Sequence, residues 1–193
     1  MTDTIEDDDS GPNINSYLLD TGVVSYLIDE DNVHHKWMYN QIEIIAGGDV
    51  YICGITIAQI EYGLRLADAI HHVDANNIRD ALAGFETIPM DIDLMRQYGI
   101  IRAGLFRRYA PRTPQGARHR HATRASQLVD GTNDLQLGIQ ENDIWVVAAA
   151  SLRSLHLLTT NLGRGKERIV DEAQRAVGWD LIHVLDLPQL RGD

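Results

Sequence analysis

Short apolar runs alternate with longer segments of helical spacing along most of this chain, and this alternation strongly limits the fold. Strand-like runs occupy residues 17–20, 50–53, 86–89, 155–159 and 179–184. Helical spacing of apolar residues occupies residues 23–28, 33–46, 56–67, 74–83, 91–109, 142–154 and 169–177. Strands that alternate with helices form βα units, whose strands lie parallel with helices on both faces. The sequence therefore predicts an α/β fold, a three-layer α/β/α sandwich around a mostly parallel sheet of about five strands.

The chain length of 193 residues suits one folded domain with short tails. Residues 1–14 are acidic and contain Gly11-Pro12, so we expect a disordered tail there. The domain itself is expected over residues 15–186, followed by a second tail at 187–193. Within the domain we expect a basic insertion around residues 107–138, because this region is rich in Pro and Gly and lacks a clear periodic pattern.

The net charge of −11 argues at first against a protein that binds nucleic acid, since phosphates favour basic surfaces. The distribution changes this interpretation, because residues 94–129 contain eight arginines and no Asp or Glu. A local basic patch can bind phosphates while the acidic remainder limits unspecific binding. An ordinary solvated loop is the alternative. The arginines expected to contact a nucleic-acid backbone are Arg107, Arg108, Arg112, Arg118, Arg120 and Arg124.

The amino-terminal residues are acidic where a secretory signal peptide has a basic start and an apolar stretch. No run in the sequence is long and apolar enough to span a bilayer. We therefore expect a cytoplasmic protein that has no membrane partner.

Acidic and amide side chains follow the predicted strands, where the binding sites of parallel sheets usually lie. Asp20 ends the first strand, Glu61 follows the second and Asn161 follows the fourth. Asp143 opens the helix before the fourth strand, and the long preceding segment allows this helix to begin at the same edge. Two carboxylates about 4 Å apart repel each other by roughly 4 kcal/mol near a protein surface. Mg²⁺ or Mn²⁺ relieves such repulsion and carries water that can attack a phosphate.

Four segments, in this order, resemble the motifs of PIN domains of the VapC toxin family. They are residues 17–25, 55–64, 141–149 and 157–161. The acidic positions of the family fall on Asp20, Glu61 and Asp143, and its threonine or serine position falls on Thr159. The similarity covers roughly residues 15–185.

This resemblance implies a PIN-like fold and Mg²⁺-dependent cleavage of RNA by the toxin of a type II toxin–antitoxin pair. Asp20 and Asp143 would be the main metal ligands, and Glu61 would bind the metal or orient the attacking water. Thr159 would place a hydroxyl near the site, and Asn161 would offer an uncharged oxygen. The implied partners are an RNA substrate, an antitoxin protein and a second copy of the chain.

Two departures from the family pattern favour an alternative, a PIN fold with weakened or lost catalysis that binds RNA or protein. Gly22 stands where many relatives have asparagine, and Asn161 stands where the family commonly has a fourth acid. Glu167 or Glu141 could substitute for this acid by position. A nuclease of the same fold that acts on DNA is a third interpretation.

Two weaker signals are assigned no role. The run Gly163-Arg-Gly-Lys166 lacks the leading glycine and the final Ser or Thr of a phosphate-binding loop. The histidine pairs have no further carboxylate at the spacing of a zinc site.

Overall fold

The computed structural model describes residues 16–45, 48–68, 75–112, 115–117, 124–130 and 135–187. The tail expected at residues 1–14 and nearly all of the second tail lie outside these residues, as do Arg118 and Arg120. Among the described residues, no helix combines the length and the apolar composition needed to cross a membrane.

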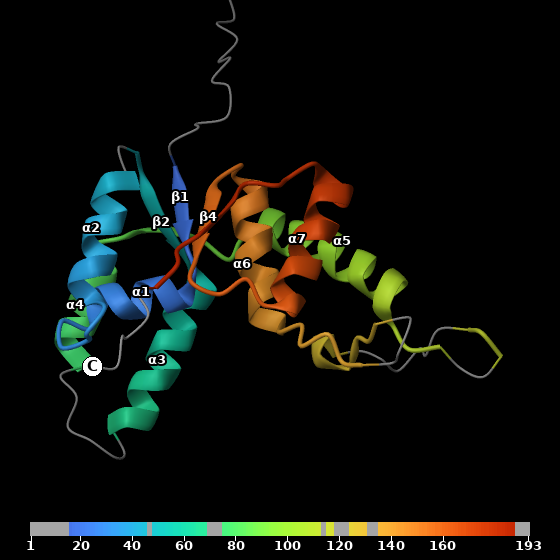
Figure 1. Cartoon of the computed structure of the whole chain (residues 1–193), viewed down its shortest axis with the longest axis horizontal. Helices are drawn as coiled ribbons and strands as arrows, with labels where there is room; N and C mark the ends of the chain where they lie inside the picture. The colour runs from blue at the N-terminus through green and yellow to red at the C-terminus, as the bar shows by residue number, and fades with distance from the viewer. Residues whose placement is uncertain are drawn as a thin grey trace, which may run out of the picture.

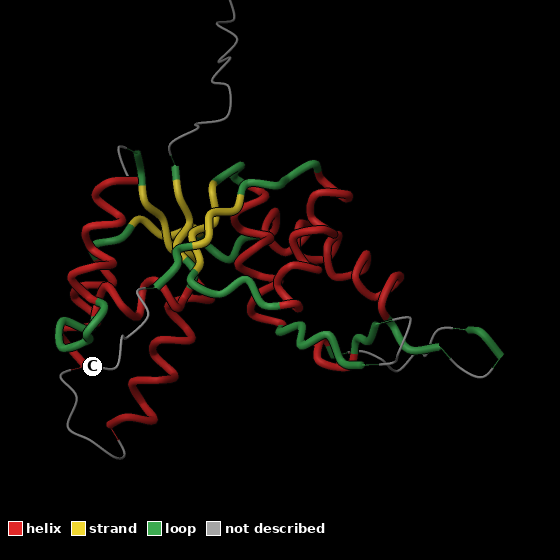
Figure 2. Tube along the Cα trace, viewed as in Figure 1, coloured by secondary structure: helices red, strands yellow, loops and turns green. Residues whose placement is uncertain are grey.

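One parallel sheet runs through the centre of the molecule (Figure 2). Its strands are β1 (Tyr17–Leu19), β2 (Val50–Cys53), β3 (Glu86–Ile88), β4 (His156–Thr159) and β5 (Ile182–Val184). Their order across the sheet is β3-β2-β1-β4-β5, and each neighbouring pair is parallel. The five strands predicted from the apolar runs are confirmed.

Helices cover both faces of this sheet (Figure 1). They are α1 (Thr21–Ile28), α2 (His35–Ile45), α3 (Gly54–Asp68), α4 (Ala75–Ala83), α5 (Ile92–Tyr109), α6 (Glu141–Leu152) and α7 (Arg164–Val177), with a short 3₁₀ helix η1 (Ala125–Gln127). In Figure 1, α1 to α4 lie on one side of the sheet and α5 to α7 on the other. The predicted three-layer α/β/α fold is therefore confirmed.

The two faces of the strand β4, which lies between β1 and β5, contact different parts of the core. Leu157 packs into the cluster formed with α5, α6 and α7, whereas Leu158 packs into the cluster formed with α1 to α4. Both side chains are fully buried. Successive side chains of a strand point to opposite faces of the sheet, so β4 contacts both helical layers.

Described parts of the predicted basic insertion pack against the domain. The Val129 N–H donates to the Tyr109 carbonyl at 2.9 Å, and the Leu137 N–H donates to the Leu128 carbonyl at 3.0 Å. Leu128 is fully buried. This segment therefore leads the chain from the end of α5 to the start of α6.

The helix α7 begins at Arg164 rather than at Ile169, where the apolar pattern predicts its start. Residues 164–168 are glycine and charged residues, so hydrophobic periodicity alone does not reveal this first turn. The earlier start brings Lys166 into the helix and turns its side chain toward the protein interior, where it is buried.

Candidate active site

The register between β1 and β4 places Asp20 beside Thr159. Leu19 pairs with Leu158, and the Asp20 N–H donates to the Leu158 carbonyl at 2.9 Å. Asp20 then caps α1, because one carboxylate oxygen accepts the Thr21 N–H at 2.8 Å. Its other oxygen, Oδ2, accepts the Thr159 hydroxyl at 2.6 Å. Asp20 is therefore held at the carboxyl edge of the sheet by groups from both strands.

Lys166 joins Asp20 to Asp143. Its Nζ donates to Asp20 Oδ2 and lies 3.4 Å from Asp143 Oδ1. The same Nζ donates to Thr159 Oγ1 at 3.3 Å. Three segments far apart in the sequence thus place two carboxylates and a hydroxyl around one ammonium group. Asp20, Asp143 and Thr159, all predicted site residues, come together here.

The environment of Asp143 disfavours its charged form more than solvent would. Burial raises the pKa of the Asp143 carboxyl, and the Asp20 charge raises it further, while Lys166 opposes both. Asp143 also lies in the first turn of α6, where the helix dipole favours a negative charge. The site is therefore an acid pair that depends on a neighbouring cation.

A pocket of about 250 Å³ opens beside this cluster. Asp143, Asn161 and Lys166 line it, together with the backbone around Gly138 and Gly165. The Asn161 N–H donates to Thr159 Oγ1 at 3.2 Å, so this loop also supports the hydroxyl. Asn161, another predicted site residue, therefore lies at the edge of the same site.

Glu61 faces other partners. Arg79 of α4 binds its carboxylate through two nitrogens, at 2.9 Å and 2.8 Å, and Arg65 binds it at 2.9 Å. The hydrogen bond from Arg79 lowers the pKa of Glu61. Glu61 is not among the residues that line the pocket beside Asp143. The structure thus brings together Asp20 and Asp143 and places Glu61 in a separate ion-pair cluster.

Neither acid considered as a substitute for the missing fourth one lines the pocket. Glu141 accepts hydrogen bonds from Tyr98 and from Arg102, and Glu167 is an exposed residue of α7. At the other departure from the family pattern, a Cβ added to Gly22 would lie 3.2 Å from Thr160 Oγ1. A larger residue at position 22 would therefore press against the loop after β4.

The described arginines of the basic segment differ in their surroundings. Arg107, Arg112 and Arg124 are exposed. Arg108 lies 3.3 Å from the buried Glu172 of α7. Arg124 precedes Ala125, whose N–H donates to Glu141 Oε2 at 3.2 Å, two residues before Asp143. This end of the basic segment is therefore attached to the helix that carries the acid.

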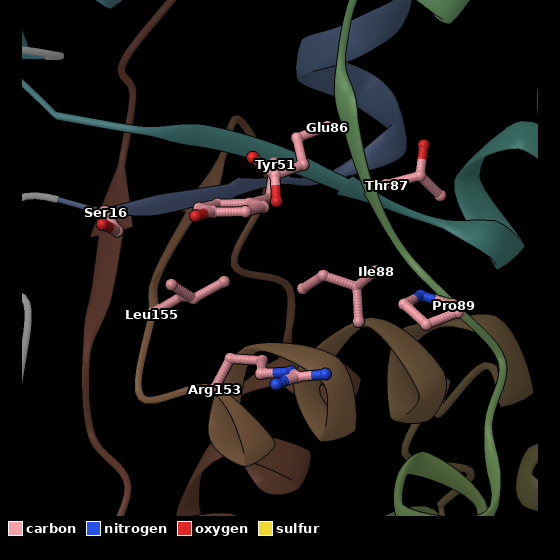
Figure 3. A pocket seen from close by; sticks show the side chains of 8 residues that line it. All are labelled: Ser16, Tyr51, Glu86, Thr87, Ile88, Pro89, Arg153 and Leu155. Atoms are coloured by element: carbon pink, nitrogen blue, oxygen red, sulfur yellow. The ribbon is translucent and has the colours of Figure 1, made fainter.

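A second pocket, of about 320 Å³, extends from the residues before β1 and β4 to the end of β3 (Figure 3). Ser16 and Leu155, which precede β1 and β4, line it together with Tyr51. Figure 3 shows the Arg153 guanidinium pointing into this space. Neither Asp20 nor Asp143 lines this pocket, so it is not part of the candidate site.

The acid pair has the chemistry of a cation site. Two carboxylate oxygens and one hydroxyl oxygen surround the Lys166 ammonium, and Mg²⁺ and Mn²⁺ prefer such oxygens as ligands. The ammonium shows that a cation fits between Asp20 and Asp143. The described residues contain no group of three or more His, Cys, Asp or Glu side chains that could hold a metal ion. Asp20 and Asp143 therefore fit a divalent cation in type, and Lys166 holds the position between them.

Lys166 is the functional residue that the sequence motifs do not reveal. A signal exists, because Lys166 precedes Ile169 by three residues and Ala173 by seven, which places it on the buried face of α7. A charged residue on an apolar helix face points to a buried partner of opposite charge. Here those partners are Asp20 and Asp143.

The fold and the acid pair together define a parallel α/β domain with its site at the carboxyl edge of the sheet. The family model described as "PIN domain" matches residues 17–110, which include Asp20 and Glu61. Residues 17–110 therefore match a PIN domain, and the resemblance predicted from the motifs is confirmed. The match ends before Asp143, and the sheet continues beyond it through β4 and β5.

Solved structures share this fold at low sequence identity. A chain of VapBC2 from Rickettsia felis, bound to a DNA fragment from its promoter, is similar with a TM-score of 0.56 and 19% identity, over 89% of this chain and 99% of that chain. A chain of DNA-bound VapBC from Salmonella typhimurium gives a TM-score of 0.50 and 19% identity, over 89% and 98% of the two chains. No curated protein sequence matches this chain. The structural likeness establishes the architecture over nearly the whole described domain.

Proposed function

We propose that this chain is a metal-dependent endoribonuclease and the toxin of a type II toxin–antitoxin pair that acts in the cytoplasm. The observation that carries the proposal is the convergence of Asp20 and Asp143 on one cation at the carboxyl edge of a PIN fold. PIN domains are generally nucleases, which supports cleavage of a phosphodiester as the reaction.

Each residue of the site has a role that follows from its contacts. Asp20 and Asp143 would hold Mg²⁺ or Mn²⁺, which when bound supplies an activated water and neutralises charge on the phosphate. Thr159 donates its hydroxyl to Asp20 Oδ2 and so fixes the orientation of this carboxylate. Asn161 supports Thr159 from the loop after β4. Glu61 would join the site only by leaving Arg65 and Arg79.

The substrate and partners of the proposal follow from charge and from the related complexes. Exposed arginines around the start of α6 would hold the RNA backbone by phosphate contacts. VapBC complexes supply the precedent for an antitoxin partner. The resemblance to the VapC family also favours a homodimer.

Cleavage of a mixed RNA pool by the purified chain tests this proposal, with Mg²⁺, with Mn²⁺ and with EDTA. We expect metal-dependent cutting that falls at least about a hundredfold in Asp143→Asn and in Asp20→Asn, because each substitution removes a charged ligand. Asn keeps the shape of the side chain, so both variants should remain folded by circular dichroism. Cutting by both variants at the wild-type rate would refute the site assignment.

A second candidate function is a PIN-fold module that binds RNA or protein without turnover. Two observations favour it, the Lys166 ammonium between the acids and the pairing of Glu61 with arginines. RNA that binds with a steep salt dependence, and stays intact under every metal condition, would support this module over the nuclease.

A further inference from the structure

We infer that Lys166 is an internal cation that holds the metal position of the acid pair, so that a divalent cation binds only by displacing its ammonium group. The inference deepens the proposed function and rests on it only in treating Asp20 and Asp143 as a cation site. It concerns the occupancy of the site rather than the reaction.

The geometry around Lys166 resembles the coordination of a small ion. Its Nζ has three oxygen neighbours from three different segments, namely Asp20 Oδ2, Thr159 Oγ1 at 3.3 Å and Asp143 Oδ1 at 3.4 Å. An ammonium group has three donors and no acceptor, so its capacity matches these oxygens. The side chain is 9% exposed, so little water shares this position.

Lys166 occupies a place that is unfavourable for a cation in every respect except the acid pair. It lies in the first turn of α7, where the helix dipole disfavours positive charge. Burial adds a further cost, which only a paired carboxylate offsets. Asp20 and Asp143 together supply two negative charges against this one ammonium. The carboxylates therefore account for its position, and a doubly charged ion would compete for the same oxygens.

The identity of the residue supports this interpretation. The chain contains fifteen arginines and two lysines, Lys36 and Lys166. An ammonium group is a compact point charge, whereas a guanidinium is a planar fork that fits a side-on carboxylate. The compact cation stands where oxygens converge from several directions.

The packing of α7 fixes the backbone at Lys166, while the side chain borders an open pocket. A Cβ added to the neighbouring Gly165 would lie 2.5 Å from the Gly138 carbonyl oxygen, so the start of α7 is in contact with the segment before α6. Lys166 also lines the open pocket beside Asp143 and Asn161. Its flexible stem therefore has space into which a displaced ammonium group can turn.

Isothermal titration calorimetry with Mn²⁺ tests the inference on the full chain. We compare wild type, Lys166→Met and Arg164→Met. Arg164 is exposed and lines the same pocket, so Arg164→Met removes one positive charge nearby without touching the acids. We expect Lys166→Met to bind Mn²⁺ at least about tenfold more tightly than wild type, and Arg164→Met to differ from wild type by less than about threefold. Equal affinities for wild type and Lys166→Met, or weaker binding by the variant, would overturn the inference.

Reductive methylation of the wild-type protein decides the question if Lys166→Met does not fold. Lys36 is exposed and serves as the internal reference for buried Lys166. We expect Lys166 to be protected without metal and to react severalfold faster at saturating Mg²⁺, as measured by mass spectrometry of peptides. An unchanged Lys166 rate, with Lys36 reacting equally in both conditions, would contradict displacement.

These measurements separate the inference from the proposed nuclease. Tighter Mn²⁺ binding by Lys166→Met than by wild type, with no RNA cut by either protein, would support the inference and refute the nuclease. Metal-dependent cutting by wild type, together with equal Mn²⁺ affinity of wild type and Lys166→Met, would support the nuclease and refute the inference.

Discussion

Glu141, two residues before Asp143, stabilises the fold through hydrogen bonds. It accepts hydrogen bonds from the Tyr98 hydroxyl, from Arg102 Nε at 2.9 Å and from the Ala125 N–H at 3.2 Å. Burial alone would raise the pKa of Glu141, but these hydrogen bonds outweigh it and lower the pKa. Glu141 therefore stays ionised and ties the start of α6 to α5 and η1.

Titration of the Tyr98 hydroxyl tests its hydrogen bond to Glu141. Burial and the Glu141 carboxylate raise the pKa of Tyr98 to about 12, and the ring also stacks on Trp145 with centroids 3.8 Å apart. We expect Tyr98→Phe to remove an absorbance step near pH 12 from the tyrosinate titration. A matched Tyr39→Phe, at a ring that is 52% exposed, should leave this step near pH 12 in place.

The same pair predicts how stability depends on pH. Because the folded-state pKa of Tyr98 is raised, its contribution is complete below about pH 10 and is lost as the pH rises toward about 12. Tyr98→Phe should lower the unfolding free energy by about 1–2 kcal/mol at neutral pH. This difference should shrink between about pH 10 and pH 12 in urea titrations. A difference that grew over this range would show that the hydrogen bond to Glu141 is misassigned.

At the scale of elements, the start of α7 decides what the site contains. Its first turn packs against the segment before α6 at Gly165 and Gly138, and this contact sets the depth of Lys166. Asp143 follows on α6, so the acid and the cation come from two helices that are locked together at their first turns.

Gly165→Ala should therefore disturb both stability and the site. The new Cβ would lie 2.5 Å from the Gly138 carbonyl oxygen and 2.8 Å from the Ile139 nitrogen, which are backbone atoms that cannot turn away. We expect a loss of about 1–3 kcal/mol in unfolding free energy by urea titration. Gly99→Ala is the matched control, because nothing lies within 4 Å of its added Cβ on α5. It should stabilise by about 0.5–1 kcal/mol, and a similar gain in Gly165→Ala would show that the close approach is absent.

At the scale of the whole molecule, the central sheet couples two cores into one unit. Leu157 and Leu158 are neighbours in sequence but point into opposite cores, and both are completely buried. Either core depends on the position of β4, which also carries Thr159. The domain should therefore unfold as one cooperative unit.

Leu157→Ala and Leu158→Ala test this coupling. We expect each variant to lose about 2–5 kcal/mol of unfolding free energy, because each leaves a cavity in a packed layer. Each should show a single transition of lowered midpoint in calorimetry. Val33→Ala, at a side chain that is 75% exposed, should change stability by less than about 0.5 kcal/mol. Two separate transitions in either leucine variant would mean that the layers fold independently.

The order of the elements and many of their bounds follow from the sequence, because the apolar periods of strands and helices are local. The β2 strand at residues 50–53 and the α5 helix ending at residue 109 illustrate this. The placement of Asp20 at the end of β1 also follows, since the strand ends where its apolar run ends.

Only the tertiary structure decided which side chains meet. Asp20 lies beside Thr159 because of the register between β1 and β4, which are separated by most of the chain. Glu61 pairs with Arg79 because α3 packs against α4, and Lys166 reaches the acids because α7 starts one turn earlier than its apolar residues indicate. The local periodicity of apolar residues carries no information about contacts between residues that are far apart in the sequence. The sequence by itself therefore determined the PIN architecture, because strand and helix periods are local, and the packing of strands and helices decided that Lys166 stands between Asp20 and Asp143.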